Sequence, residues 1–133
     1  MDIVDCMAVR VLGRVALLGS RGCVEEVALF DTGASKSFVD ISAAEKLGYV
    51  RYEAPKEVLL AVKNYRALIV GEVTVGVVVE GVKLPISHVF GVTEGLRHPV
   101  VIGMDIMEPY EIYIDIKEGK PKFKRIPPTI ELI

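Results

Sequence analysis

Apolar and polar residues alternate along most of this chain, with the period of two that is typical of strands burying one face. The alternation is clear in residues 9–17, where valine and leucine occupy most odd positions and Arg10 and Arg14 occupy even ones. Residues 19–22 read Gly-Ser-Arg-Gly, which is a turn signal, and residues 24–30 return as a second strand. A hairpin centred on this turn places Cys23 opposite Leu18.

The same pattern continues to the end of the chain, with two short segments that favour helix. Residues 42–48 place strong helix formers between a serine and a glycine, and residues 104–107 fit one helical turn. Residues 58–62 and 67–70 flank a polar tip and predict a hairpin. Pro85 places the segment 82–90 at a sheet edge or a bulge. Further strands are expected at 38–39, 73–79, 100–102, 110–116 and 121–126, with a loop over 92–99.

These elements predict an all-β domain with one or two short helices. The chain has 133 residues, which suits one hydrophobic core. Two prolines at 127 and 128 end the regular pattern, and no linker separates two parts. We therefore expect a single domain over residues 1–133, with a core of about 9–126 and a tail over 127–133.

Composition narrows the possible functions. The chain is 51% apolar and 26% charged, with a net charge of -2, which is unlike a disordered chain and unlike a nucleic-acid binder with a basic face. No apolar run reaches the ~18 residues of a membrane-spanning helix. The N-terminus lacks the pattern of a secretory signal, and Cys6 and Cys23 lack metal-ligand spacing, so we expect a cytoplasmic protein with buried, reduced thiols.

Amide side chains are almost absent from the sequence. It contains no glutamine, and Asn64 is its only asparagine. Depletion of these thermolabile residues is one trend of hyperthermophile proteins, so the composition predicts a thermophilic source.

The most informative segment is Asp31-Thr32-Gly33-Ala34-Ser35, which follows the apolar residues 27–30 directly. A carboxylate at the end of a buried strand is partly desolvated and needs donors or a cation. The glycine allows another backbone or a ligand to approach closely. The alternative is an ordinary strand that ends in an Asx turn.

A second segment, residues 100–107, reads Val-Val-Ile-Gly-Met-Asp-Ile-Met, an apolar strand followed by a glycine and a short helix. The two segments together, in this order and with a hairpin between them, resemble the retropepsin-like aspartic proteases over about residues 14–123. The resemblance implies a closed acid-protease barrel. It also implies a peptide-bond hydrolase that uses no metal and no cofactor.

The resemblance further implies a mechanism and a partner. One Asp31 from each of two identical subunits would form the catalytic pair, one as general base on a water and the other as general acid. Thr32 would donate a hydrogen bond from its hydroxyl across the dimer, and Gly33 would accept a hydrogen bond from the substrate. Ala34 stands where retropepsins also have alanine. Asp105 would bond near Ser37 and support the active-site loop.

An extended peptide or protein is the implied substrate, held under the hairpin 58–70 as a flap. Asn64 at the flap tip could make the tight turn, and Tyr65 could reach substrate or be an exposed loop tyrosine. The remaining candidate substrate contacts are Gly33, Ser35, Leu29, Phe38, Pro99 and Val101, and simple core packing is the alternative for the apolar ones.

The sequence departs from the retroviral pattern at a set of charged positions. Retroviral enzymes have aspartate where Ser35 stands and arginine where Met104 stands, and Arg14 lies at the offset of a further arginine of that network. The network is thus lost as a set. His88 and His98 lie near no nucleophile motif, and we expect them to be surface or edge residues.

Two other functions remain open. A domain with the same fold could bind an extended peptide by strand addition without cleaving it. Alternatively, the Asp-Thr-Gly match could be coincidental in a structural β module.

Overall fold

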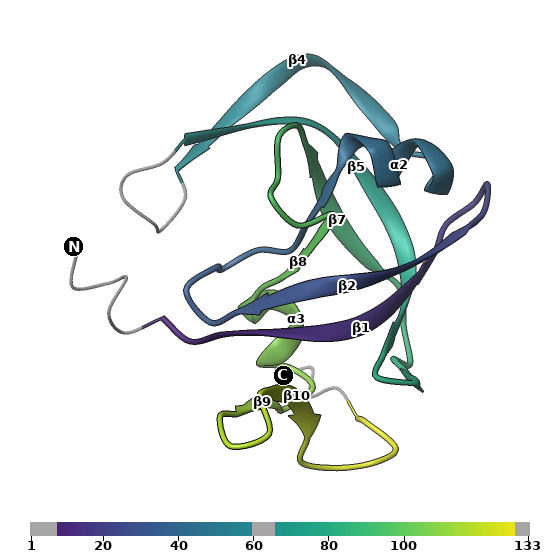
Figure 1. The fold of residues 1–133 in the computed structure, drawn as a ribbon. Helices are drawn as coiled ribbons and strands as arrows, with labels where there is room; N and C mark the ends of the chain where they lie inside the picture. Colours follow the sequence, from purple (N-terminus) through teal and green to yellow (C-terminus); the bar gives the residue numbers. More distant parts are fainter. Residues whose placement is uncertain (1–7, 60–65, 130–133) are drawn as a thin grey trace.

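The computed structural model describes residues 8–59 and 66–129. Strands dominate it, as the alternation predicts, and two short helices interrupt them (Figure 1). In chain order the elements are β1 (Arg10–Leu18), β2 (Cys23–Asp31), β3 (Phe38–Asp40), α2 (Ile41–Leu47), β4 (Val50–Leu59), β5 (Arg66–Val79), β6 (Val82–Lys83), β7 (His88–Thr93), β8 (Val100–Ile102), α3 (Met104–Met107), β9 (Ile112–Asp115) and β10 (Lys120–Phe123).

Six of these strands close into a barrel. They follow one another in the order β1-β2-β8-β3-β7-β5, and β5 pairs back onto β1. The strands β4 and β6 are added to β5 outside this ring. Most neighbours are antiparallel, but β2 pairs with β8 and β3 with β7 in parallel. The parallel pairing of β2 with β8 places β8 beside the end of β2, although about seventy residues separate these two strands along the chain. The predicted all-β barrel with two short helices is confirmed.

The first hairpin has the predicted register, with Leu18 opposite Cys23. Other boundaries differ from the prediction. The strand β5 is continuous across Gly71, and its pairing with β7 shifts by one residue there instead of ending. The predicted return strand 82–90 is broken into β6 and β7, with Pro85 between them, since proline cannot donate to a ladder. The strand β7 then runs on to Thr93, inside the predicted loop 92–99.

The helix α2 covers one side of the barrel (Figure 1). It buries Ala43, Ala44 and Leu47 against the core. Its N-cap is Asp40, whose carboxylate accepts from the Ser42 backbone at 3.3 Å, so the cap lies two residues before the serine that marked the helix in the sequence. Gly48 ends the helix with φ 83°, a conformation that glycine adopts at little cost.

The hairpin of β9 and β10 packs against β1 outside the barrel. Gly13 makes this contact possible, because a Cβ atom there would lie 2.7 Å from both the Phe30 ring and Pro121. The absent side chain therefore lets the C-terminal hairpin lie close to the first strand.

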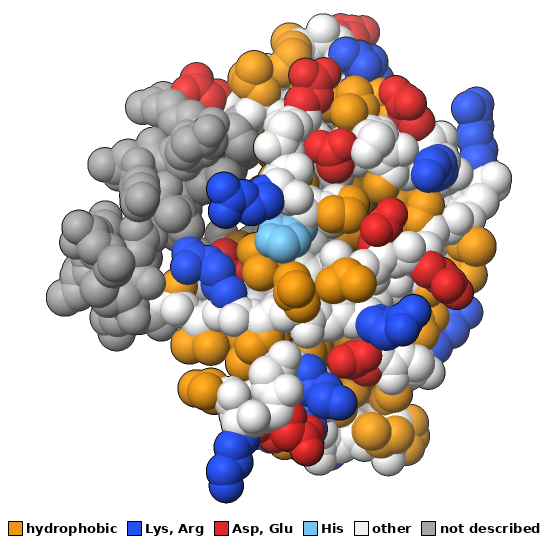
Figure 2. Space-filling model, in the orientation of Figure 1, with side chains coloured by type: hydrophobic (Ala, Val, Ile, Leu, Met, Phe, Trp, Pro, Cys, Tyr) orange, Lys and Arg blue, Asp and Glu red, His pale blue; other side chains and the backbone are white. Residues whose placement is uncertain are grey.

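Charges of both signs are interspersed on the face that Figure 2 shows, and no single-sign patch dominates it. This agrees with the net charge of -2. Within residues 8–59 and 66–129, no helix is long and apolar enough to span a membrane.

The buried helix face gives a test of the fold. Leu47 is fully buried between α2 and the barrel, so Leu47→Ala removes apolar contacts and leaves a cavity. We expect it to lower the free energy of unfolding by about 2–5 kcal/mol in chemical denaturation. Ile116→Ala is the matched control because Ile116 is 77% exposed, and it should change stability little. Equal effects of the two variants would contradict this packing.

Candidate active site

Asp31 is the last residue of β2, and its carboxylate is largely enclosed, with the residue 6% exposed. Two donors satisfy it. The Gly33 backbone N–H donates to Oδ1 at 2.8 Å, and the Arg10 Nε–H donates to Oδ2 at 3.1 Å. The Ala34 backbone N–H closes the turn by donating to the Asp31 carbonyl at 3.1 Å. The carboxylate is therefore held in place by its own loop and by a cation from β1.

Thr32 extends the β1–β2 ladder beyond Asp31. Its backbone N–H donates to the Val9 carbonyl at 3.0 Å, and its Oγ1 accepts from the Val9 N–H at 2.8 Å. The hydroxyl itself donates back to the Val9 carbonyl at 3.3 Å. Within the subunit, Thr32 thus fixes the start of β1 to the active-site loop. Its predicted bond across a dimer stays a prediction.

Asp105 at the start of α3 binds the loop of residues 34–37 that follows Asp31-Thr32-Gly33, a contact that we call the clamp. Its carboxylate accepts from the Ser37 hydroxyl at 2.6 Å and from the Ser37 backbone N–H at 3.1 Å. The Ser37 hydroxyl oxygen also accepts from the Gly103 N–H at 2.9 Å, and the Met104 N–H donates to the Ala34 carbonyl at 2.8 Å. The start of α3 therefore holds both ends of residues 34–37. The predicted contact between Asp105 and Ser37 is present.

Gly103 allows this clamp to close. A Cβ atom at this position would lie 2.6 Å from the Lys36 carbonyl oxygen and 2.7 Å from that of Ala34. These are backbone atoms that cannot swing aside. The glycine in the second sequence segment is thus required by the close approach of two loops.

The arginine that contacts Asp31 is Arg10, which the sequence analysis did not single out. In the β1–β2 ladder Arg10 lies opposite Asp31, whereas Arg14 lies opposite Val27. The sequence by itself does not distinguish the two arginines, because the distinction depends on the register of this hairpin.

The predicted pocket residues differ in how far they are accessible. Leu29 and Val101 are half-buried neighbours on the parallel strands β2 and β8, and Pro99 is also half-buried. Phe38 is only 6% exposed and packs over Gly91, so in the single subunit it belongs to the core. Ser35 is exposed on the loop.

The predicted flap falls partly outside the described residues. Asn64 and Tyr65 at its tip lie outside them, whereas its two arms belong to β4 and β5. The arms pair antiparallel, with a register shift between Arg51 and Lys56. The hairpin is thus longer than predicted, because β4 begins at Val50.

His88 is half-buried at the start of β7, where the described strand pairs with Val75 of β5 only, because the pairing of β7 with β3 begins at Gly91. This position agrees with the surface or edge residue that the sequence predicts. The His88 Nε2 lies 2.5 Å from the hydroxyl of Tyr110, which is 2% exposed. The rings meet edge to face at 5.3 Å. Burial lowers the pKa of His88, and the negative charge of Asp105 opposes this shift. His88 thus favours the neutral form, in which its Nε2 shares a hydrogen bond with the Tyr110 hydroxyl. His98 is half-buried.

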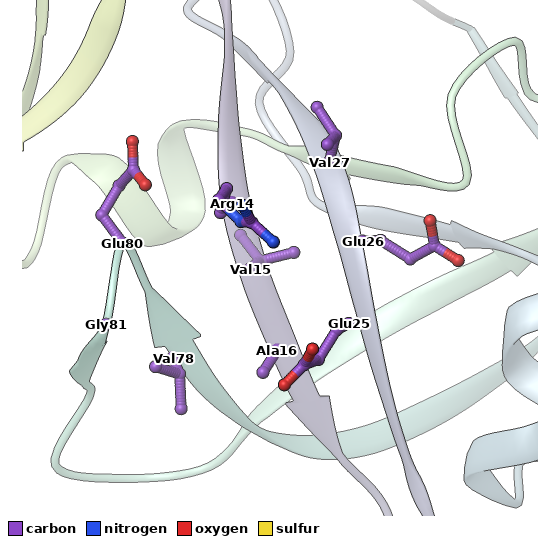
Figure 3. Close-up of a pocket in the computed structure, with 9 residues that line it drawn as sticks. All are labelled: Arg14, Val15, Ala16, Glu25, Glu26, Val27, Val78, Glu80 and Gly81. Atoms are coloured by element: carbon purple, nitrogen blue, oxygen red, sulfur yellow. The ribbon is translucent and has the colours of Figure 1, made fainter.

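No group of three or more metal-ligating side chains lies together within the described parts of the chain. A pocket of about 440 Å³ lies farther along the first hairpin from Asp31 (Figure 3). Arg14 lines it together with three glutamates, and Asp31 does not. The pocket is lined by Arg14, Val15, Ala16, Glu25, Glu26, Val27, Val78, Glu80 and Gly81.

Comparison with solved structures identifies the architecture. The retroviral protease-like domain of Ddi1 from Leishmania major superposes with a TM-score of 0.62 at 23% identity, covering 89% of this chain and 91% of that one. A retropepsin-like aspartic protease from Rickettsia conorii gives 0.52 at 18% identity, covering 81% and 84%. The chain has the retropepsin-like fold. No protein-family model matches the sequence, and no curated protein matches it either.

The clamp under the active-site loop gives a testable stability effect. Ser37 is fully buried, and Ser37→Ala leaves the Gly103 N–H and one Asp105 oxygen without their partner. We expect a loss of about 1–3 kcal/mol in the free energy of unfolding. Ser35→Ala is the control on the same loop, where the exposed hydroxyl should contribute little. A loss no larger than that of the control would contradict the clamp.

His88 predicts a pH dependence of stability. Because its pKa is lowered in the folded state, the unfolded chain binds the proton more readily. The contribution of His88 to the free energy of unfolding is complete above about pH 6.5, the ordinary pKa of histidine. It is lost as the pH falls through the lower pKa that His88 has in the folded state. His88→Gln keeps a polar side chain that does not titrate. It should reduce the slope of the unfolding free energy against pH between about pH 7 and 5, by at most the amount that corresponds to one bound proton. Equal slopes in the two proteins would contradict the prediction.

Proposed function

We propose that this protein is a homodimeric aspartic endopeptidase whose catalytic pair consists of Asp31 from each subunit. The observation that carries the proposal is the position of Asp31 on the retropepsin-like fold. Its carboxylate ends a buried strand, is nearly enclosed, and has Oδ1 fixed by the Gly33 N–H at 2.8 Å. A carboxylate fixed in this way is positioned without further reorganisation.

The chemistry requires two carboxyl groups, and each chain supplies one Asp-Thr-Gly segment. A twofold dimer pairs Asp31 with its own copy, because an isologous interface brings identical residues together at its axis. Two carboxyls at hydrogen-bond distance share one proton, since they do not both ionise easily. The ionised one accepts a proton from a water, which attacks the scissile carbonyl. The protonated one donates to the carbonyl oxygen, which gives a tetrahedral intermediate. When the C–N bond of this intermediate breaks, the proton taken from the water passes to the leaving amine, and the proton on the former carbonyl oxygen returns to the pair.

An extended peptide is the substrate that the surroundings of Asp31 fit best. Leu29 and Val101 offer half-buried apolar surface on the strands beside Asp31, and the half-buried Pro99 lies two residues before Val101 in the sequence. Apolar side chains next to the scissile bond suit such a surface. The strand β4 lies outside the ring of six strands and pairs with the first part of β5, where a flap would cover the peptide (Figure 1). Cys23 is exposed and not buried as the sequence predicted, because its place at the start of β2 next to the turn leaves it open to solvent. A free thiol suits a reducing, cytoplasmic setting.

A peptide-binding domain without catalysis is the second candidate. The observation that favours it is the ion pair between Arg10 and Asp31, which occupies the oxygen that catalysis needs. Such a domain would take up extended peptide by strand addition and leave it intact.

Removal of the proposed catalytic carboxylate separates the two functions. Asp31→Asn keeps the shape of the side chain but removes the general base, so peptide cleavage should fall by about three orders of magnitude or more. Cleavage of a mixed peptide library, followed by mass spectrometry, measures this loss. Asp115→Asn is the control, because Asp115 lies on β9, outside the active-site loop. Cleavage that survives in Asp31→Asn would reject the catalytic pair, and peptide binding without any cleavage by the unmodified protein would favour the binding domain.

A further inference from the structure

Arg10 on β1 forms an ion pair with Asp31, the proposed catalytic carboxylate. The Arg10 Nε–H donates to Asp31 Oδ2 at 3.1 Å, and the two residues face each other across the β1–β2 ladder. The side chains are 34% and 9% exposed, so the arginine lies at the open side of a nearly enclosed carboxylate. Oδ1 meanwhile keeps its bond to the Gly33 N–H. Arg10 therefore occupies the one oxygen that the loop backbone leaves free.

This contact conflicts with the state that catalysis requires. A salt bridge to arginine needs an ionised carboxylate, because the guanidinium has donors only. The catalytic pair needs one shared proton, so one of the two carboxyls must be able to hold it. With Arg10 bonded to Oδ2 in both subunits, neither carboxylate is free to accept the proton or to meet its copy. The contact can belong to the separate subunit but not to the working pair.

We propose that Arg10 is a latch: it neutralises Asp31 in the separate subunit and leaves Oδ2 when two subunits join. This inference rests on the proposed dimeric protease and adds a control on when the site becomes active. The separate subunit is kept stable by its own cation, and cleavage is confined to the dimer.

The geometry suits a contact that opens. Arg10 donates one hydrogen bond to the carboxylate, from Nε, whereas a bidentate pair with two parallel hydrogen bonds would be the stronger arrangement. Its long side chain is one-third exposed, so the guanidinium can turn toward water when it leaves. Asp31 stays in place because its loop is fixed through Gly33 and Ala34.

The test measures the dimer dissociation constant by sedimentation, which needs no substrate. Arg10→Met removes the latch but keeps the length and apolar stem of the side chain. Each separate subunit then loses the contact that competes with pairing. We expect about a threefold gain per subunit and therefore about tenfold tighter dimerisation at neutral pH and low salt. Added salt should tighten the unmodified dimer and have less effect on Arg10→Met, because screening weakens the ion pair.

Arg14→Met is the matched control. Arg14 lies four residues farther along the same strand, opposite Val27 in the pocket that Figure 3 shows, away from Asp31. Its replacement should leave the dissociation constant within about twofold of the unmodified protein. If Arg10→Met matches this control, or weakens the dimer, the latch is wrong.

A double-mutant cycle assigns the effect to the ion pair itself. In the Asp31→Asn background there is no anion to hold, so adding Arg10→Met should change the dissociation constant less than twofold. The same tenfold gain in both backgrounds would overturn the proposal. If Arg10→Met does not fold, Arg10→Gln replaces it in the cycle with the same expected direction.

Activity distinguishes failure of the latch from failure of the proposed function. Turnover per dimer should be retained or raised in Arg10→Met, and a fall of more than tenfold would overturn the latch by making Arg10 part of the catalytic machinery. Tighter dimerisation of Arg10→Met with no cleavage by any variant would support the latch and reject the protease. Absence of a dimer at every concentration, in the unmodified protein and in Arg10→Met alike, would overturn both.

Discussion

A carboxylate at the end of a buried strand is the constraint on which the site depends. Asp31 is too enclosed to be solvated by bulk water, so the fold must supply its partners. The loop gives it the Gly33 N–H, and the neighbouring strand gives it Arg10. Both partners follow from the way β1 and β2 pair up to the last residue of the strand. The position that makes the carboxylate useful for chemistry also makes it costly to leave unpaired.

A second layer of polar contacts supports this loop from inside the protein. Asp105 and Ser37 join the start of α3 to residues 34–37. Gly103 lets the two segments approach closely because it has no side chain. His88 and Tyr110 form a further, partly buried polar pair, and Asp105 acts electrostatically on His88. Buried hydrogen bonds of this kind restrict the loop to one arrangement, since each broken bond leaves a desolvated group. Rigidity of the active-site loop is therefore built into the subunit before any dimer forms.

The fold and the proposed activity rest on different kinds of support. The fold is shared with two solved structures, a retroviral protease-like domain and a retropepsin-like aspartic protease, at identities of 23% and 18%. Identity at this level establishes a shared fold, whereas function depends on the site that the fold carries. This chain carries Asp31-Thr32-Gly33, with Ser35 and Met104 at the positions where the resemblance to retroviral enzymes implies a charged pair. The structure adds the ion pair of Arg10 with Asp31.

The sequence by itself determined the strand class, the first hairpin with Leu18 opposite Cys23, the two short helices and the importance of the Asp31 segment. Those features follow from local rules: a period of two, turn glycines and helix-capping residues are written within a few neighbouring positions. Only the tertiary structure decided that Arg10 and not Arg14 meets Asp31, that His88 is paired with Tyr110, and that β5 runs unbroken past Gly71. These depend on register and on contacts between distant segments, where a shift of a few residues changes every partner while the local pattern stays the same.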